Sequence, residues 1–285
     1  MPEDSRLRRW ARRRPLLTFS VLAIGLGWIV ALPLVVSKAG IGLFDVNVPE
    51  EWIMLVATTP TIAALWVQWL SAGNFRISAL GRPWWRVLFG AAGAVLLVLL
   101  AYTVVPALLL TGGAAGSLHW GAIVTASAGY WINPFNLLGG PLNEEPGWRG
   151  FALPRFRLRY GAFPGSVRLA TLWIVWHAPL LLVKGWLGIP IWAFIILLLC
   201  LTILMTWGAS FSGGSIVTAV LMHAVYNSNF PILVGLCRGL PTREPGLAYY
   251  VAGAVLTTLI VIGATRGRLG WTGTSPTGDI AGEPG

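Results

Sequence analysis

Mostly apolar stretches of about 18 to 25 residues recur along the chain, and short connections containing proline, glycine and charged residues separate them. A helix that crosses a bilayer needs about 20 consecutive apolar residues, so the pattern predicts about eight membrane-spanning helices. The expected ranges are 15–36, 51–70, 86–110, 120–140, 166–183, 189–207, 215–236 and 247–264. The fourth and seventh of these hold the most polar residues. We therefore expect an all-α fold, a polytopic helix bundle.

Composition places this bundle in a membrane. Hydrophobic residues make up 56% of the 285 residues and charged residues only 11%, which is typical of a multi-pass membrane protein. The arginine-rich start, "RLRRWARRRP", resembles the first part of a secretory signal. The apolar run that follows is longer than a signal core and lacks a cleavage site of small residues. We predict a retained first helix.

The formal net charge of +10 reflects orientation in the membrane. The basic residues flank the apolar stretches instead of forming a stripe on a soluble surface, which disfavours nucleic acid as a partner. An eight-span topology places sixteen of them on one side: Arg6, Arg8, Arg9, Arg12, Arg13, Arg14, Arg76, Arg82, Arg86, Arg149, Arg155, Arg157, Arg159, Arg168, Arg266 and Arg268. The other side holds Lys38, Lys184, Arg238 and Arg243. Because the cytoplasmic loops of membrane proteins carry an excess of Lys and Arg, the side with sixteen basic residues is assigned to the cytoplasm, and both termini are predicted to lie there.

The stretch "PLNEEPGWRG" places two adjacent acids between apolar runs. A Gly-Gly-Pro run ends the preceding span, Asn143 is expected to cap a new helix, and Pro146 fits the first turn of that helix. Glu144 and Glu145 then lie at a helix N-terminus, with Arg149 one turn beyond Glu145 and within reach of it. Adjacent helical residues point about 100° apart, so one glutamate can pair with Arg149 while the other faces a cavity.

Two histidines lie inside later apolar stretches, where an uncompensated polar group is costly and is a functional candidate. Trp173 precedes His177 by four residues, and Asn227 follows His223 by four, so each pair shares a helix face. Pro179 is expected to bend the helix just beyond His177. Both helices enter from the cytoplasm in the predicted topology, so the histidines fall at similar depth. A glutamate beside them is suited to take a proton from water, and His and Asn can donate to an oxyanion.

Three short motifs occur in order: "EEPGWR", "WIVWH" and "HAVYN". They resemble the Glu-Glu-x-x-x-Arg, aromatic-x-x-x-His and His-x-x-x-Asn motifs of the intramembrane CAAX proteases and bacteriocin-processing proteins, the CPBP or Abi family. The resemblance covers about residues 130 to 235. The second motif often carries Phe where this chain has Trp173, or Trp176 beside the histidine. Because an aromatic ring is kept, we expect altered packing and retained chemistry.

The resemblance implies an endopeptidase that hydrolyses a peptide bond within or at the membrane, in a cavity open to the cytoplasmic side. By position in the motifs, Glu144 is the general base that activates water, and His177 helps to hold that water. His223 and Asn227 stabilise the oxyanion. The supporting residues are Glu145, Arg149 and Trp173.

A cofactor is not required in this interpretation. The same residue types also suit zinc, and a zinc ion would be held by Glu144, His177 and His223. The spacing leaves metal dependence open, since the chain has no His-Glu-x-x-His pair. Cys200 and Cys237 have no metal-type spacing and are expected to be small buried residues.

The resulting organisation has three parts. Residues 1–119 form three N-terminal spans, 120–265 form the CPBP-like core of five spans, and 266–285 form a disordered tail. The expected partners are the lipid bilayer and a membrane-associated peptide or protein substrate. A non-catalytic bacteriocin immunity or scaffold protein of the same fold is the alternative. A transporter is a weaker one, because no internal repeat is evident.

Overall fold

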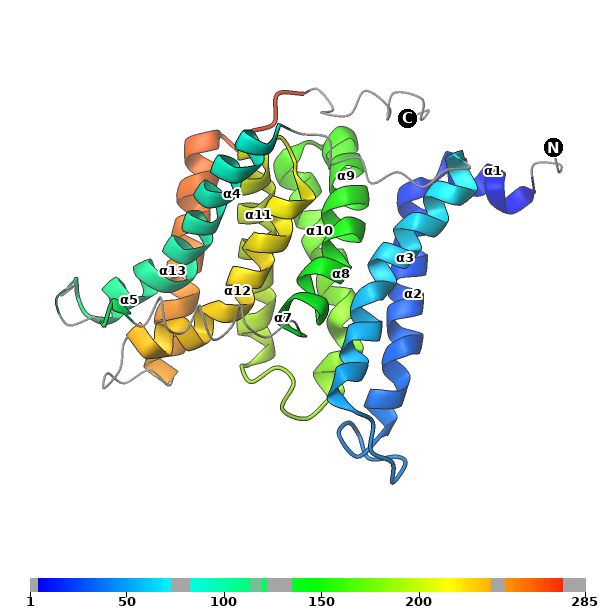
Figure 1. The fold of residues 1–285 in the computed structure, drawn as a ribbon, viewed down its shortest axis with the longest axis horizontal. Helices are drawn as coiled ribbons and strands as arrows, with labels where there is room; N and C mark the ends of the chain where they lie inside the picture. Colours follow the sequence, from blue (N-terminus) through cyan, green and yellow to red (C-terminus); the bar gives the residue numbers. More distant parts are fainter. Residues whose placement is uncertain are drawn as a thin grey trace.

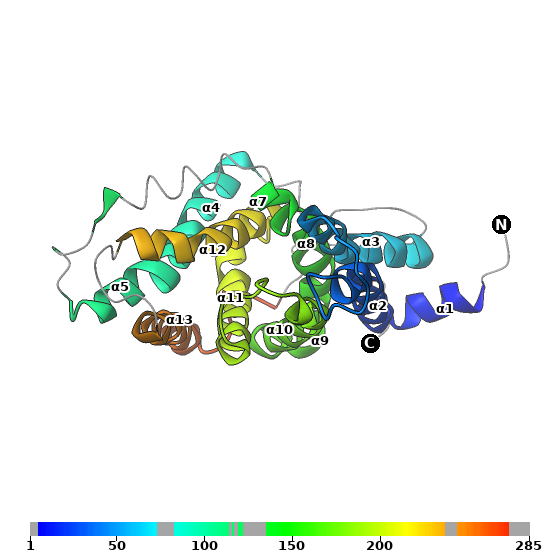
Figure 2. The ribbon, with the colours of Figure 1, turned by 90° about the horizontal axis from the view of Figure 1, so that it is seen from below.

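The structure is a computed structural model of the 285-residue chain, and it describes residues 5–72, 83–113, 116, 119–121, 135–236 and 244–273. The described residues form helices and contain no strand. The long helices stand side by side as a bundle, and the short helices α7 and α8 lie among them (Figures 1 and 2). The predicted all-α, polytopic membrane bundle is confirmed.

Six helices within the described residues are long and apolar enough to cross a membrane. They are α2 (Pro15–Val36), η1 with α3 (Glu50–Trp52, Ile53–Ala72), α4 with η2 and α5 (Trp84–Leu99, Leu100–Val104, Val105–Leu110), α10 with η5 (Ala162–His177, Ala178–Leu182), α11 (Ile191–Phe211) and α13 (Glu244–Thr265). The seventh expected span coincides with α12 (Ile216–Leu236). Most of the fourth, 122–134, lies outside the described residues, as does Cys237. The number eight stays a prediction.

Short helices complete the described chain. They are α1 (Arg6–Arg13), α7 (Phe135–Leu138), α8 (Pro141–Glu145), the π-helix η4 (Pro146–Ala152) and α9 (Leu153–Tyr160). Of the tail that we expected to be disordered, residues 266–273 are described, and Leu269 is fully buried. The chain therefore packs against the bundle beyond α13, and the prediction of disorder is wrong for Leu269.

The two ends of the bundle differ in charge. Helices α1 and α9, the start of α4 and the end of α13 lie at the upper end in Figure 1, and they carry the arginine-rich segments. The loops that follow α2 and η5 lie at the opposite end in Figure 1, and the Lys184 ammonium of the second loop donates to the carbonyl of Lys38 in the first at 3.1 Å. Arg149 belongs to neither group, because it is buried within the bundle. Which end faces the cytoplasm stays a prediction.

Aromatic packing holds the π-helix η4 against two of the long helices. Phe19 of α2 contacts Trp148 edge to face at 5.4 Å between ring centroids and Phe151 at 5.1 Å. Trp148 in turn meets Trp176 of α10 at 6.0 Å. Such pairs add about 0.5–1.5 kcal/mol each beyond the area they bury. They fix the segment that follows the two glutamates.

The outward faces of the long helices are apolar. Helix α2 exposes Val21, Ile29 and Leu32, and α13 exposes Leu259 and Ile260. An aqueous surface would not favour such a belt, whereas lipid chains solvate it. Many hydroxyls within the spans donate to carbonyls three or four residues earlier, as in Thr18, Ser20, Thr59, Thr202, Thr206, Thr257 and Thr258. These bonds satisfy polar groups without water.

Candidate active site

The two glutamates lie in the short helix α8, which begins earlier than expected. Pro141 takes the first helical position, and the N–H of Glu144 donates to the carbonyl of Gly140 at 2.8 Å. The predicted cap, Asn143, is inside this helix, and its amide donates to the carbonyl of Leu138. That prediction is wrong because the fixed φ of proline starts the helix three residues sooner, with Gly140 as the N-cap.

Pro146 also differs from expectation. Because α8 already begins at Pro141, Pro146 follows the last residue of α8 and opens the π-helix η4 instead of lying in the first turn of the helix that holds the glutamates. Helices of this wide type are rare and are frequent at functional sites. The π-helix places Trp148 and Arg149 on the buried side of the segment.

Helix α3 supports this segment from the N-terminal half of the chain. The hydroxyl of Thr61 donates to the carbonyl of Asn143 at 2.6 Å. A Cβ placed on Gly147 would lie 2.5 Å from the carbonyl oxygen of Pro60, so only glycine allows the two backbones to approach so closely. The position of the glutamates therefore depends on contacts with a helix more than 80 residues away in sequence, since Thr61 and Asn143 differ by 82 positions.

Glu145 lies at the centre of a buried ion cluster. It is fully buried, and its Oε1 accepts from Arg149 at 3.0 Å and from Nδ1 of His223 at 2.8 Å. The predicted pairing of Glu145 with Arg149 is confirmed. The bond to His223, which joins residues 78 positions apart, was not foreseen from the sequence. The guanidinium of Arg149 and the second donor from His223 together compensate the cost of burying the charge of the Glu145 carboxylate.

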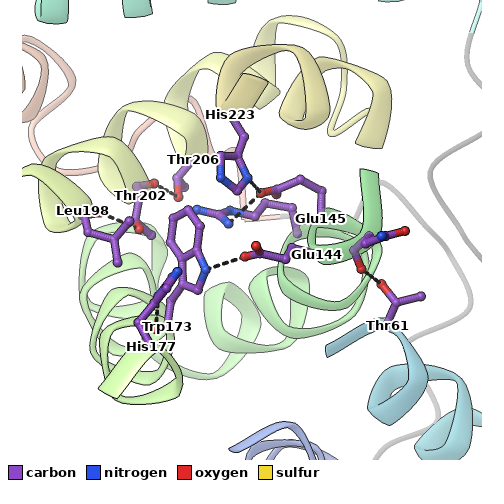
Figure 3. Close-up of polar contacts among 11 residues, drawn as sticks. Thr61, Glu144, Glu145, Trp173, His177, Leu198, Thr202, Thr206 and His223 are labelled. Carbon is purple, nitrogen blue, oxygen red and sulfur yellow. Dashed lines mark hydrogen bonds and ion pairs between the residues drawn. The ribbon is translucent and has the colours of Figure 1, made fainter. Parts of the chain in front are cut away.

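Glu144 makes a different set of contacts. Its side chain is 4% exposed, and its Oε2 accepts a hydrogen bond from the indole N–H of Trp173 at 2.7 Å (Figure 3). Glu144 lies outside the six candidate spans. Burial raises the pKa of its carboxyl above the ordinary 4.5, with a smaller upward effect from Glu145, while His223, Trp173 and Arg149 act to lower this pKa.

The second oxygen of Glu144 faces Gly140, together with two groups from α12. A Cβ placed on Gly140 would lie 3.2 Å from Oε1 of Glu144 and 3.7 Å from both Nδ2 of Asn227 and Cε1 of His223. Three of the four predicted catalytic side chains therefore surround one point. Asn227 is exposed whereas Glu144 and His223 are buried, so the cluster reaches the surface at Asn227.

His177 lies at the end of α10, where the helix changes to the 3₁₀ turn η5. Pro179, at which a bend was expected, lies within this 3₁₀ turn. Pro179 has no N–H for the carbonyl of Val175, and this carbonyl accepts from Trp28 of α2 at 3.1 Å instead. Nδ1 of His177 lies 2.8 Å from the carbonyl oxygen of Trp173. A carbonyl can only accept, so Nδ1 carries the proton and Nε2 has the free lone pair.

Aromatic rings surround His177. Its ring meets Trp176 at 4.7 Å, Phe194 at 5.3 Å and Trp186 at 5.6 Å between centroids. Trp173 contacts both histidines, His177 at 5.7 Å and His223 at 5.1 Å. His177 thus adjoins the cluster around Gly140 through Trp173, and the predicted site residues form one contiguous group.

The donor set was tested for a metal ion. No three His, Cys, Asp or Glu side chains of the described ranges form a group that could hold one metal ion. Glu144, His177 and His223 are all described, and this set is not assembled as a ligand sphere. We therefore derive no step through zinc.

This fold and this cluster are typical of polytopic helical membrane proteins whose site combines a buried glutamate and histidine with an asparagine at the surface. Residues 125–229, which include every predicted site residue, match the family model described as type II CAAX prenyl endopeptidase Rce1-like. A relative named CAAX prenyl protease 2, from Methanococcus maripaludis, is 29% identical over 133 residues, which are 43% of this chain and 48% of the relative. The chain thus matches about half the length of this relative. Both findings confirm the predicted resemblance to the CPBP family.

Proposed function

We propose that this protein is an intramembrane endopeptidase that hydrolyses a peptide bond of a membrane-associated protein or peptide with water activated by Glu144. The observation that carries the proposal is the convergence of Glu144, His223 and Asn227 around Gly140. The family match and the protease name of the relative support the same reaction type.

Glu144 has the geometry of a general base. Its Oε2 is occupied by Trp173, which leaves Oε1 to accept a proton from water. The water oxygen then forms a bond to the carbonyl carbon of the substrate, and the carbonyl oxygen becomes an oxyanion. When the C–N bond breaks, the proton held by Glu144 passes to the leaving amine. Burial of Glu144 favours a base that gains and returns a proton.

His223 and Asn227 are the donors for the oxyanion. The side-chain amide of Asn227 does not titrate, so its Nδ2 is always a hydrogen-bond donor. This Nδ2 and Oε1 of Glu144 lie around the same space beside Gly140. His223 already uses Nδ1 to bind Glu145. To donate from Nε2 as well, its ring must carry both protons, and the carboxylate of Glu145 balances that charge.

His177 has a different task. Its Nε2 lone pair can accept a hydrogen bond from the water, because Nδ1 is bound to the carbonyl of Trp173. We assign it to holding the water. Glu145 and Arg149 maintain the position of His223 through their buried ion pair.

We further propose that the substrate includes a prenylated C-terminal segment, since the family description and the name of the relative both refer to CAAX prenyl substrates. Both termini are assigned to the cytoplasm, because the arginine-rich segments gather at one end of the bundle.

The test compares membranes that contain the active protein with membranes that contain Glu144→Gln. Gln keeps the size of the side chain and removes its basicity. Peptides released only by the active protein identify the substrate, and an internally quenched peptide with or without a prenylated cysteine tests lipid recognition. We expect cleavage to be abolished in Glu144→Gln at unchanged membrane insertion. Undiminished cleavage would refute the mechanism, and no difference between active protein and membranes without it would favour an immunity or scaffold role.

A further inference from the structure

Trp173 contacts four groups of the site, one on each of Glu144, Arg149, His177 and His223. Its indole N–H donates to Glu144, and its carbonyl oxygen accepts from His177. Its ring lies against the guanidinium of Arg149, whose Cζ is 4.1 Å from the ring centroid, and meets His223 edge to face. The residue is 1% exposed, so burial and these contacts together fix the orientation of its ring.

The indole N–H is chemically specific to tryptophan at this position. A phenylalanine ring of the same motif would fill much of the same space, but it has no donor for the carboxylate. The hydrogen bond of 2.7 Å to Oε2 is buried, and a hydrogen bond to an ionised carboxylate is about twice as strong as a neutral one. The sequence had suggested only altered packing here, and the structure shows a direct contact with the proposed base.

The bond also selects which oxygen of Glu144 can react. With Oε2 held by Trp173, the carboxylate plane is fixed and Oε1 is directed to the space beside Gly140, where Asn227 and His223 also converge. Without the bond, the carboxyl group could rotate about its terminal torsion, which is broad for a glutamate. Catalysis depends on such placement, because a misplacement of about 1 Å can cost about 100-fold in rate.

Resting on the proposed function, we infer that Trp173 is a positioning residue. It orients Glu144 so that Oε1 alone receives the proton of water, and it stabilises the ionised carboxylate. It acts through Glu144 and does not touch the reacting atoms.

The test is Trp173→Phe, with Trp176→Phe as the matched control. Both tryptophans belong to α10, both are almost fully buried, and both pack against His177. They differ in the partner of the indole N–H, because Trp176 donates to Thr59 at 3.1 Å and not to Glu144. Both variants lose similar volume, so thermal unfolding should report similar destabilisation.

Kinetics with the prenylated quenched peptide separate the two roles. In Trp173→Phe we expect kcat to fall by about 10- to 100-fold with KM changed little, because the lost bond serves a charged group. The acid limb of the pH profile of kcat/KM should move upward by about one pH unit, since the ionised form of Glu144 loses a donor. The charged and titratable groups around Glu144, namely Glu145, Arg149, His177 and His223, stay unchanged in both variants. Trp176→Phe should keep the wild-type acid limb.

Two outcomes would overturn the inference about Trp173 alone. In the first, Trp173→Phe has the wild-type kcat and the wild-type acid limb, while Glu144→Gln is inactive. This result would refute the role of Trp173 and would still support the proposed function. The second is an equal loss of kcat in both Phe variants with unmoved pH profiles, which indicates packing alone. Activity in Glu144→Gln would refute the proposed function and this inference with it. If Trp173→Phe does not fold, benzothienylalanine at position 173 carries the same test, because sulfur replaces the N–H in a ring of the same shape.

Discussion

Gly140→Ala offers the sharpest test of the site geometry. The new methyl carbon would lie 3.2 Å from Oε1 of Glu144 and 3.7 Å from Nδ2 of Asn227 and Cε1 of His223. It would occupy the space in which water must meet the base, and the carboxylate would have to yield by a few tenths of an ångström. We expect kcat/KM to fall by about 100-fold, which corresponds to about 2.7 kcal/mol of lost transition-state stabilisation.

The same substitution should affect folding only slightly. The φ of Gly140 is −173°, so alanine does not have to enter the left-handed region that favours glycine. Alanine is a poorer N-cap than glycine, which costs about 0.5–1 kcal/mol and lowers Tm by about 2–4 °C. The assay measures cleavage of the quenched peptide and thermal unfolding of the same purified sample.

Gly93→Ala is the matched control. A Cβ there would meet only the ring of Phe211 at 3.5 Å, an ordinary contact, and Gly93 lies inside α4. Alanine favours a helix over glycine by about 1 kcal/mol, so this variant should keep full activity and equal or higher stability. Wild-type activity in Gly140→Ala would show that the space beside Gly140 is not where the water reacts.

Two further predictions concern the frame of the site. Glu145→Gln removes the charge that compensates Arg149 and should lower stability by about 3–5 kcal/mol. The loss should be clearly larger than in Glu144→Gln, because the Glu144 carboxylate forms no ion pair with any residue that the structure describes. Equal melting temperatures would contradict the central role of Glu145. Gly147→Ala should prevent accumulation of folded protein, measured by size-exclusion chromatography, because its Cβ would meet the Pro60 carbonyl oxygen at 2.5 Å, whereas Gly25→Ala, with no atom within 4 Å, should behave as wild type.

Helix positions could be predicted because a lipid-facing helix must carry an apolar run of fixed length. For α2 the predicted range and the helix Pro15–Val36 agree, and for α13 the ends differ by a few residues. The start of α8 was missed, because a five-residue helix has no periodic signal, and its first residue is set by Pro141 and by the support of Thr61 from α3.

The candidate residues were also accessible from sequence, since buried ionisable groups are rare in apolar runs and the four-residue spacings place them on shared helix faces. The separate roles of Glu144 and Glu145 could not be predicted from the sequence. Spacing showed that one glutamate can reach Arg149, but nothing local indicates that Glu145 also binds His223, 78 positions away. A signal for Gly140 was present as the break before the acids, but its meaning required neighbours from another helix.

Local composition and helical periodicity are enough to predict a polytopic helical membrane protein with three short polar motifs. The packing of the helices was needed to show that Oε2 of Glu144 binds Trp173 while Oε1 faces Gly140, Asn227 and His223. The choice between two carboxylate oxygens depends on directions in space among α8, α10 and α12. Residue spacing along one helix does not contain those directions, since they arise when the helices pack against one another.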